Sequence, residues 1–352
     1  MRKTYKIVLF LALSIPLVSI AGNPDRAGQA GATELLINPW PKSSGWGNVN
    51  TGSVHGVEAI FGNVAGVALT KKTEVAFAHS IWLKGSSMSI NTLGLTQKVG
   101  EGSVLGLSLM TFSFGDIPIT TVDQPEGGLG DFSPQFLNIS LCYAKAFSNS
   151  IYGGLNVKVI NESISNVNAT GVALDAGIQY VTGFNADRDN FKVGITLKNV
   201  GTPMKFGGDG LSSRVLVSNV SPSYEYTVEQ RANGFEIPSL LGIGLSYDAK
   251  LAKDHRLTIG LGFTSNSFTQ DNFQGGLEYS FKEYFMLRGG YVYEQDIFDN
   301  DLRTTVFTGP CAGLSIQVPL GKNSSTKFGV DYSYRATNPF DGTHTFGAYF
   351  IL

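Results

Sequence analysis

Apolar and polar residues alternate along most of the chain after residue 72. Residues 257–263 read LTIGLGF, and residues 137–143 read LNISLCY. A period of two is typical of β-strands, because successive side chains point to opposite faces. The pattern predicts about fourteen strands, near residues 73–83, 87–98, 103–114, 135–148, 150–161, 171–183, 190–199, 238–249, 255–265, 272–281, 284–294, 309–319, 326–335 and 343–352.

The face of these strands opposite the apolar one carries mainly Gly, Ser, Thr, Asn and Ala, with few charges. A soluble sandwich would also alternate, but its outward face should be charged. The composition instead favours an all-β fold, a transmembrane antiparallel barrel with lipid outside and a small, polar inner face. Aromatic residues near strand ends are expected to form interfacial girdles, with simple core packing as the alternative; they are Trp82, Phe112, Phe114, Tyr143, Phe147, Tyr180, Phe281 and Tyr284.

The connections between the predicted strands alternate in length. One set is tight, at 99–102, 148–149, 184–189, 250–254, 282–283 and 321–325. The other set is mostly longer, at 115–134, 162–170, 200–237, 266–271, 295–308 and 336–342. Short turns on one rim and long loops on the other are typical of bacterial outer-membrane barrels. An even strand number then places both termini on the short-turn, periplasmic side.

The chain before residue 73 divides into two predicted segments. Residues 1–21 combine three basic residues, an apolar run and the small-x-small sequence SIA, which is typical of a signal peptide cleaved before Gly22. Residues 22–72 alternate poorly, and Pro39 and Pro41 argue against regular structure there. We therefore expect a plug at 22–72, with a periplasmic tail as the alternative, and a barrel at 73–352.

Composition narrows the function classes. The 352 residues include 43 glycines and only 15% charged residues, below the roughly 25% of ordinary soluble domains. The net charge is −2 and no basic stripe occurs, so a nucleic-acid partner is not expected. No apolar run after the signal sequence reaches 18 residues, which excludes a helical membrane protein.

The residues that usually carry catalysis or metal binding are few and scattered. Two cysteines, Cys142 and Cys311, exclude a disulfide framework, although one distant disulfide stays open. The four histidines show no metal spacing, and no catalytic motif occurs, so we expect no enzyme, cofactor or metal. Six charged residues should point into the barrel, either as salt bridges that hold the plug or as a solute path; they are Asp175, Lys192, Lys198, Asp248, Glu278 and Arg288.

Two long loops contain apolar residues where a merely solvated loop would be polar. Long loops of this kind are often functional, and exposed apolar side chains suit a protein partner. The alternative is that the loops fold over the barrel mouth and pack on each other. The candidate partner-binding residues are Asp116, Ile117, Pro118, Ile119, Met204, Phe206 and Leu211.

Several segments, taken in order, resemble the PorV/PorQ family of Bacteroidota outer-membrane proteins, a FadL-like barrel group. They are VEAIFGNVAGVA at 57–68, GVALDAGIQY at 171–180, NFKVGITLKNVGTP at 190–203, GLEY at 276–279 and LRGGY at 287–291. RAG at 26–28, NPW at 38–40 and GDIP at 115–118 are most similar to PorV-like members. The resemblance covers nearly the whole mature chain.

The resemblance implies a fourteen-stranded barrel with an N-terminal plug and a part in type IX secretion. PorV-like members bind the SprA/Sov-type translocon, collect secreted proteins by their C-terminal sorting domains and shuttle them to a surface attachment complex with a PorU-type sortase. PorQ-like members belong to that attachment complex. The first hypothesis is thus a non-enzymatic shuttle in contact with outer-membrane lipid. The alternative is a FadL-like passive transporter of hydrophobic small molecules, and a third is a purely structural barrel.

Overall fold

The computed structural model of this chain describes residue 22 and residues 26–183, 188–217, 224–321 and 326–352. The predicted signal peptide, residues 1–21, lies outside the described residues.

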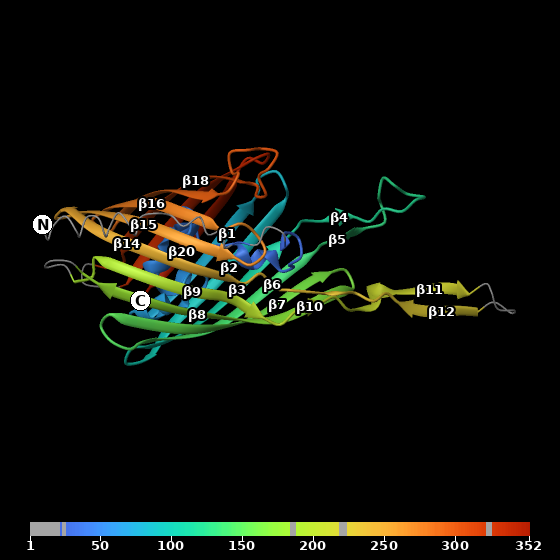
Figure 1. Ribbon diagram of the computed structural model, residues 1–352, viewed down its shortest axis with the longest axis horizontal. Coiled ribbons are helices and arrows are strands. Elements are labelled where there is room, and N and C mark those ends of the chain that lie inside the picture. The colour runs from blue at the N-terminus through green and yellow to red at the C-terminus, as the bar shows by residue number, and fades with distance from the viewer. Residues whose placement is uncertain (1–21, 23–25, 184–187, 218–223, 322–325) are drawn as a thin grey trace, which may run out of the picture.

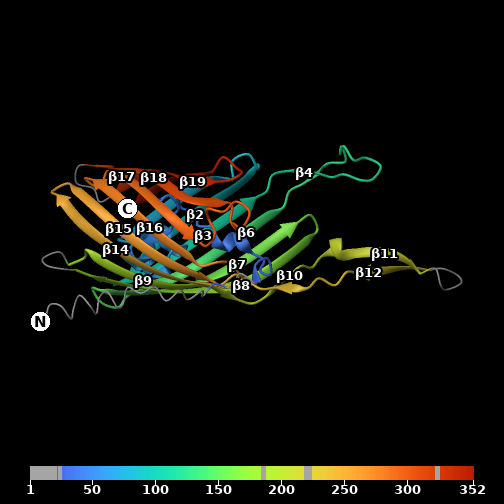
Figure 2. The same cartoon turned by 45° about the horizontal axis from the view of Figure 1, so that its top comes forward.

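Fourteen antiparallel strands close into one barrel, as predicted (Figures 1 and 2). The last strand pairs with the first, with Phe350 opposite Val75. In order around the wall the strands are β1 (Thr73–Trp82), β2 (Met88–Gly100), β3 (Ser103–Ser113), β6 (Gln135–Ala146), β7 (Ile151–Ile164), β8 (Val167–Thr182), β9 (Phe191–Gly201), β14 (Leu240–Ala252), β15 (His255–Asn266), β16 (Asn272–Phe281), β17 (Phe285–Glu294), β18 (Phe307–Pro319), β19 (Lys327–Thr337) and β20 (Thr343–Ile351).

The outer face of the barrel is apolar and exposed. Leu141, Leu155 and Leu287 are 58%, 65% and 60% exposed, although each lies within a barrel strand. Burying such side chains in lipid is favourable, and an outward apolar band is characteristic of outer-membrane barrels. Within the described residues, no helix is both long and apolar enough to cross a membrane.

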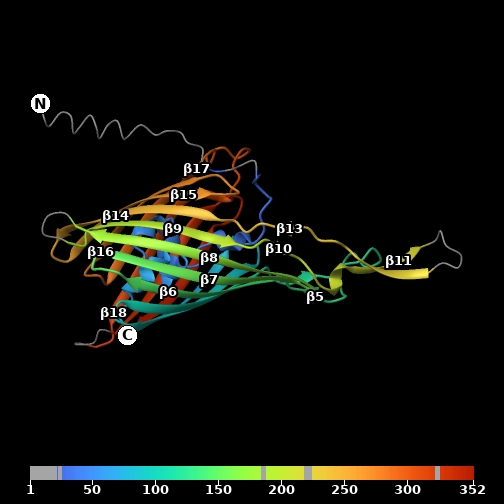
Figure 3. The same cartoon turned by 60° about the horizontal axis from the view of Figure 1, so that its bottom comes forward.

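The inner face of the barrel surrounds residues 33–69, called the luminal segment below (blue in Figures 1 and 3). Its short helices are η2 (Thr33–Leu36), α2 (Pro41–Ser44), η3 (Val49–Gly52), η4 (Gly56–Ile60) and η5 (Val64–Leu69). Glycines of the wall make room for it. A Cβ atom on Gly94 would lie 2.3 Å from Val57 Cγ1, and one on Gly194 would lie 2.2 Å from the Thr51 carbonyl oxygen. The segment therefore lies within the barrel, against its inner wall.

Pro41 does not prevent helix formation, contrary to the sequence-based expectation. It is the first residue of α2, and the Gly45 N–H donates to its carbonyl oxygen over 2.9 Å. Proline is tolerated at the first helical position because the N–H it lacks would have no partner within the helix.

The long-loop rim has two features that the sequence did not indicate. On the long-loop rim, β7 and β8 extend further than predicted, so the expected loop at 162–170 is only the turn Ser165–Asn166. On the same rim, two hairpins project away from the barrel (Figures 1 and 2). The first arm contains β4 (Ile117–Pro118) and β5 (Asp131–Phe132), and the second contains β11 (Ser212–Val217) and β12 (Tyr224–Glu229).

A small sheet lies at the base of the second arm. It consists of β10 (Met204–Lys205) and β13 (Gly234–Phe235), and the short helix η6 (Asp209–Leu211) follows β10.

The described ends of the chain lie at opposite rims. The Gly22 N–H donates to Asp271, in the loop between β15 and β16 on the long-loop rim. Leu352 pairs with Thr73 on the short-turn rim. Barrel strands β1 and β20 do begin and end at the short-turn rim, but Gly22 does not share it. The expectation of both termini on one side is wrong for Gly22, because the luminal segment runs from one rim to the other.

Candidate functional site

The luminal segment separates two cavities inside the barrel. The cavity toward the long-loop rim, called the vestibule below, has a volume of about 290 Å³. The cavity toward the short-turn rim, called the charged cavity, has a volume of about 320 Å³. Asn50 of η3 borders both cavities, so the partition between them is thin at this residue.

One wall of the vestibule is aromatic and aliphatic. Trp82, at the end of β1, meets Phe307 of β18 edge to face, with ring centroids 5.7 Å apart. Trp82 also meets Phe112 at 6.1 Å, and Ile37 and Phe61 of the luminal segment continue this wall. Such edge-to-face pairs stabilise an apolar surface beyond the area they bury.

Two residues of this aromatic group correct a prediction. Trp82 and Phe112 were expected in an interfacial girdle, but they are only 9% and 6% exposed and pack inside the barrel. An aromatic residue near a strand end has the same sequence signature on either face of the wall. By contrast, Phe147 is 68% exposed at the short-turn rim, where a girdle is expected.

The rest of the vestibule lining is largely polar, and it includes the charged side chains of Lys198 and Glu294. It also includes Asn48 and Thr51 of the luminal segment and Gln274 of β16, whose amide donates to Thr264 over 3.0 Å. Arg335 also borders the vestibule, with its guanidinium 3.7 Å from the centre of the Phe307 ring. The vestibule thus offers an apolar surface on one side and hydrogen-bonding groups on the other.

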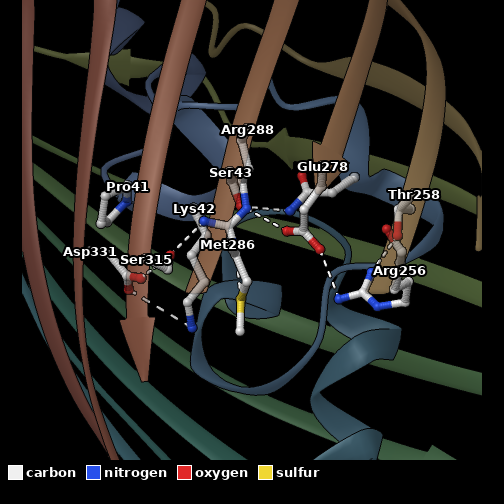
Figure 4. A network of polar contacts seen from close by, with 12 residues as sticks. Pro41, Lys42, Ser43, Arg256, Thr258, Glu278, Met286, Arg288, Ser315 and Asp331 are labelled. Carbon is white, nitrogen blue, oxygen red and sulfur yellow. Dashed lines mark hydrogen bonds and ion pairs between the residues drawn. The ribbon is translucent and has the colours of Figure 1, made fainter. Parts of the chain in front are cut away.

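The charged cavity is bordered by a belt of ion pairs across the inner wall (Figure 4). Arg288 Nε lies 2.5 Å from Glu278 Oε2, and Arg256 Nη2 lies 3.0 Å from the other oxygen of Glu278. Toward β19, Arg288 donates to Ser315, which donates to Asp331.

At its other end the belt reaches β9. Thr258 donates to Asp248 over 2.6 Å, and Lys192 Nζ lies 2.5 Å from the same carboxylate. The belt therefore crosses seven neighbouring strands, from β9 to β19, and its charged members are linked by ion pairs or through the hydroxyl groups of Thr258 and Ser315.

The predicted inward charges are largely buried, but their partners differ from the expectation. Asp175 pairs with Lys158 at 2.7 Å, and Lys192, Asp248, Glu278 and Arg288 belong to the belt. These pairs join strand to strand rather than strand to plug. A direct ion pair between the belt and the luminal segment is that of Lys42 with Asp331, at 3.8 Å.

Hydrogen bonds fix the luminal segment near its thin point. The Asn50 amide donates to Ser43 Oγ, which in turn donates to Glu58 Oε2, both over 2.9 Å. Burial raises the pKa of Glu58 to about 7, opposed by the nearby Lys42 ammonium. Sequence analysis missed this group, because the luminal segment has no period that would show which side chains meet.

A second buried carboxyl lies near the long-loop end of the segment. Glu34 of η2 is 1% exposed, and burial together with the neighbouring Glu162 raises its pKa to about 8. At neutral pH this carboxyl is therefore mainly protonated.

The predicted partner-binding residues do not form one surface. Asp116, Ile117, Pro118 and Ile119 are exposed on the first arm, and the two isoleucines are 38% and 39% exposed. Met204 is fully buried.

Met204 packs with Ile160 and Ile237 between the wall and the start of the luminal segment, so it is not available to a partner. Phe206 is half-buried against Phe235, with ring centroids 5.5 Å apart, and Leu211 is half-buried. The alternative that loops pack over the mouth therefore holds for the base of the second arm.

The second arm carries apolar residues that the sequence analysis did not select. Val215, Leu216, Tyr226 and Val228 are 41%, 59%, 52% and 40% exposed. The two strands of this arm contain β-branched and aromatic residues, which favour β-structure. This pattern could have identified the hairpin within the long loop.

The described residues contain no group of three or more His, Cys, Asp or Glu side chains placed to hold a metal ion. Cys142 and Cys311 are both free and buried.

No protein-family model matches the sequence, and no curated protein matches it. Solved structures do match, across most of both chains. CymD, a monoaromatic hydrocarbon channel, is 13% identical, with a TM-score of 0.53 over 90% of this chain and 97% of CymD.

Two toluene transporters match in the same way. TbuX of Ralstonia pickettii is 12% identical, with a TM-score of 0.53 over 89% of this chain and 97% of TbuX. TodX of Pseudomonas putida is 10% identical, with a TM-score of 0.53 over 85% and 94%. At these identities the likeness concerns the fold alone, a closed barrel of antiparallel strands.

Proposed function

We propose that the protein is a FadL-like passive transporter of small hydrophobic molecules in the bacterial outer membrane. The observation that carries this proposal is the aromatic wall of the vestibule, formed by Trp82, Phe307 and Phe61 inside the barrel. The names of the structural neighbours, monoaromatic hydrocarbon channels and toluene transporters, support it. The function needs no catalysis.

The vestibule is suited to the first step, which is capture from the long-loop side. Its volume of about 290 Å³ is near the lower end of the roughly 300–1,000 Å³ typical of small-molecule sites. An aromatic ring packed against Trp82 and Phe307 would leave water, whereas Asn48 and Gln274 would orient a polar substituent.

Passage beyond the vestibule requires the luminal segment to move. Below the segment, the belt of Arg288, Glu278 and Arg256 offers an apolar molecule no favourable surface. The hydrogen bonds of Asn50 to Ser43 and of Ser43 to Glu58 hold the partition in place. Capture and release are thus separate steps in this proposal.

The test is binding of toluene to the full-length barrel in lipid nanodiscs, measured by calorimetry. Phe307→Ala should weaken saturable binding by about tenfold, because a packed aromatic contact of this kind contributes on the order of 1 kcal/mol beyond its buried area. Phe77→Ala is the matched control, since Phe77 is 48% exposed on the lipid side of β1. Equal binding by wild type and Phe307→Ala, or no saturable binding at all, would refute the proposal.

The two arms favour a second candidate function, the type IX shuttle. Passive uptake gives no reason for hairpins that project from the rim with exposed Ile117, Ile119, Leu216 and Tyr226. Apolar side chains and unpaired strand edges are suited to binding an extended or β-rich protein segment. The partners would be the SprA/Sov-type translocon, secreted proteins with C-terminal sorting domains and the PorU-type sortase complex; the sequence resemblance supports this choice.

The second candidate is tested by recovering the tagged protein from outer membranes and identifying what accompanies it by mass spectrometry. The variant combines Ile117→Asp, Ile119→Asp, Leu216→Asp and Tyr226→Asp. If the arms bind exported proteins, these partners should be recovered from wild type and lost from the variant. A Leu251→Asp variant, changed on the short-turn rim where Leu251 is 61% exposed, should retain them. Unchanged partners in the arm variant would contradict the assignment to the arms.

A further inference from the structure

We propose that Asp271 binds the α-ammonium group that signal-peptide cleavage after Ala21 creates on Gly22. The binding site is the loop between β15 and β16, and its ligand is the mature N-terminus of the same chain. The proposal does not depend on either candidate function.

The contact that motivates this inference joins two residues that are 249 positions apart in the sequence. The Gly22 nitrogen lies 2.8 Å from Asp271 Oδ2. The other oxygen, Asp271 Oδ1, accepts the Asn266 backbone N–H over 3.1 Å, and the Asn266 side chain donates to the Gln270 carbonyl over 2.8 Å. The loop thus holds the carboxylate in place with its second oxygen directed at Gly22.

The site fits a glycine closely. A Cβ atom on Gly22 would lie 2.9 Å from both the Asp271 nitrogen and the Thr269 carbonyl oxygen, and 3.1 Å from Asp271 Oδ1. The acceptors around Gly22 are therefore two carboxylate oxygens and a carbonyl oxygen. An amide offers one N–H to such a set, whereas an ammonium group offers three and adds a positive charge.

The chemistry that produces this ligand is a single hydrolysis. A signal peptidase adds water across the Ala21–Gly22 peptide bond, which leaves a carboxylate on Ala21 and an amine on Gly22. The amine takes up a proton from water and becomes an ammonium group. The sequence SIA at 19–21 supplies the small residues that such cleavage requires.

The residues that follow are already fixed to the same rim. Arg26 forms an ion pair with Glu236 at 3.0 Å, and its guanidinium lies 4.1 Å from the centre of the Phe268 ring. The Gly31 N–H donates to the Glu236 carbonyl over 3.1 Å. Asp271 would thus be a second anchor, and it holds the N-terminus beside Thr269, which lines the vestibule.

The experiment measures how fast the Gly22 amine is dimethylated by formaldehyde and cyanoborohydride near pH 7. The mature full-length protein is labelled in detergent micelles, and trypsin then releases residues 22–26 for mass spectrometry. Native wild type should react about tenfold or more slowly than the same protein unfolded in SDS, as expected for a charge-assisted hydrogen bond. Asp271→Asn should lose most of this protection.

The matched control is Asp301→Asn, which removes an exposed carboxylate from another loop of the same rim and should keep the protection. If Asp271→Asn does not fold, Gly22→Ala provides the second test, because its methyl group would displace the amine and abolish protection. A mature chain that begins elsewhere, an amine equally reactive in native and unfolded protein, or full protection in folded Asp271→Asn would each overturn the proposal.

Discussion

The vestibule and the charged cavity lie against the same luminal segment, yet only the vestibule has an aromatic wall, and only the charged cavity is bordered by the belt of ion pairs. The vestibule has an aromatic wall around Trp82 and Phe307, and the buried carboxyl of Glu34 nearby stays mainly protonated at neutral pH. The charged cavity is bordered by ionised side chains that are matched in pairs, such as Glu278 with Arg288.

This difference makes the two ends of the barrel interior unequal for an apolar molecule. An apolar molecule gains from leaving water on the long-loop side, but it would meet paired charges on the other side. The segment between the cavities therefore separates two environments as well as two volumes.

Arg288→Met should have the largest effect on this contrast, because it removes a charge from the belt and leaves Glu278 with Arg256 alone. Breaking a buried ion pair by removing one partner costs about 3–5 kcal/mol. The expected result is a lower temperature for loss of the folded, fast-migrating form on SDS gels. The double variant Glu278→Gln, Arg288→Met should recover part of that loss; a single variant as stable as wild type would contradict the belt's role.

Gly194→Leu should disturb the partition itself. Its side chain would meet the Thr51 carbonyl of the luminal segment, and overpacking of this kind costs about 1–3 kcal/mol. We expect the segment to shift, so that the two cavities connect and ions pass in planar lipid bilayers. Gly289→Leu is the control, since a Cβ atom there meets nothing within 4 Å and should leave conductance at the wild-type value. Equal conductance in both variants would count against the segment as the partition.

Glu34→Gln should have the smallest effect, and its pH dependence is the informative part. Below pH 4.5 the Glu34 carboxyl is protonated whether the luminal segment is packed against the barrel wall or released from it. Between pH 4.5 and about 8 the carboxyl ionises when the segment is released but stays protonated when it is buried. The packed state of the wild-type segment therefore becomes less stable relative to the released state as the pH rises. The variant lacks this penalty and should hold residues 33–44 more firmly than the wild type at pH 7.

Hydrogen exchange of residues 33–44 at pH 4 and pH 7 measures this difference. Comparing variant with wild type at the same pH removes the intrinsic pH dependence of exchange. Protection by Glu34→Gln that is as large at pH 4 as at pH 7 would contradict the assignment to the carboxyl.

The wall of the barrel could be predicted from sequence because lipid on one face imposes a strict period of two. The predicted strand at 272–281 coincides with β16, and most others differ by a few residues. Loop length also indicated the two rims. The β7–β8 hairpin was the exception, since residues such as Asn166 have the polarity of a loop while their neighbours stay paired.

Contacts between segments could not be predicted in the same way. Met204 looks like any exposed loop residue in sequence, but it is buried because the second arm's base folds onto the luminal segment. The inward direction of Glu278 and Arg288 followed from the alternation, whereas their pairing depends on the register between β16 and β17. Position along one strand does not determine that register.

The seam between β1 and β20 has a consequence for how the protein is made. The luminal segment runs from the long-loop rim to β1 at the short-turn rim, so the wall encircles it completely. If β20 joined β1 first, the luminal segment, with its own bulky Trp40 and Trp46, would have to thread through a closed cylinder. Biogenesis is therefore simplest when the luminal segment packs onto an open sheet before β20 pairs with β1. In that order the barrel closes only after the segment is in place.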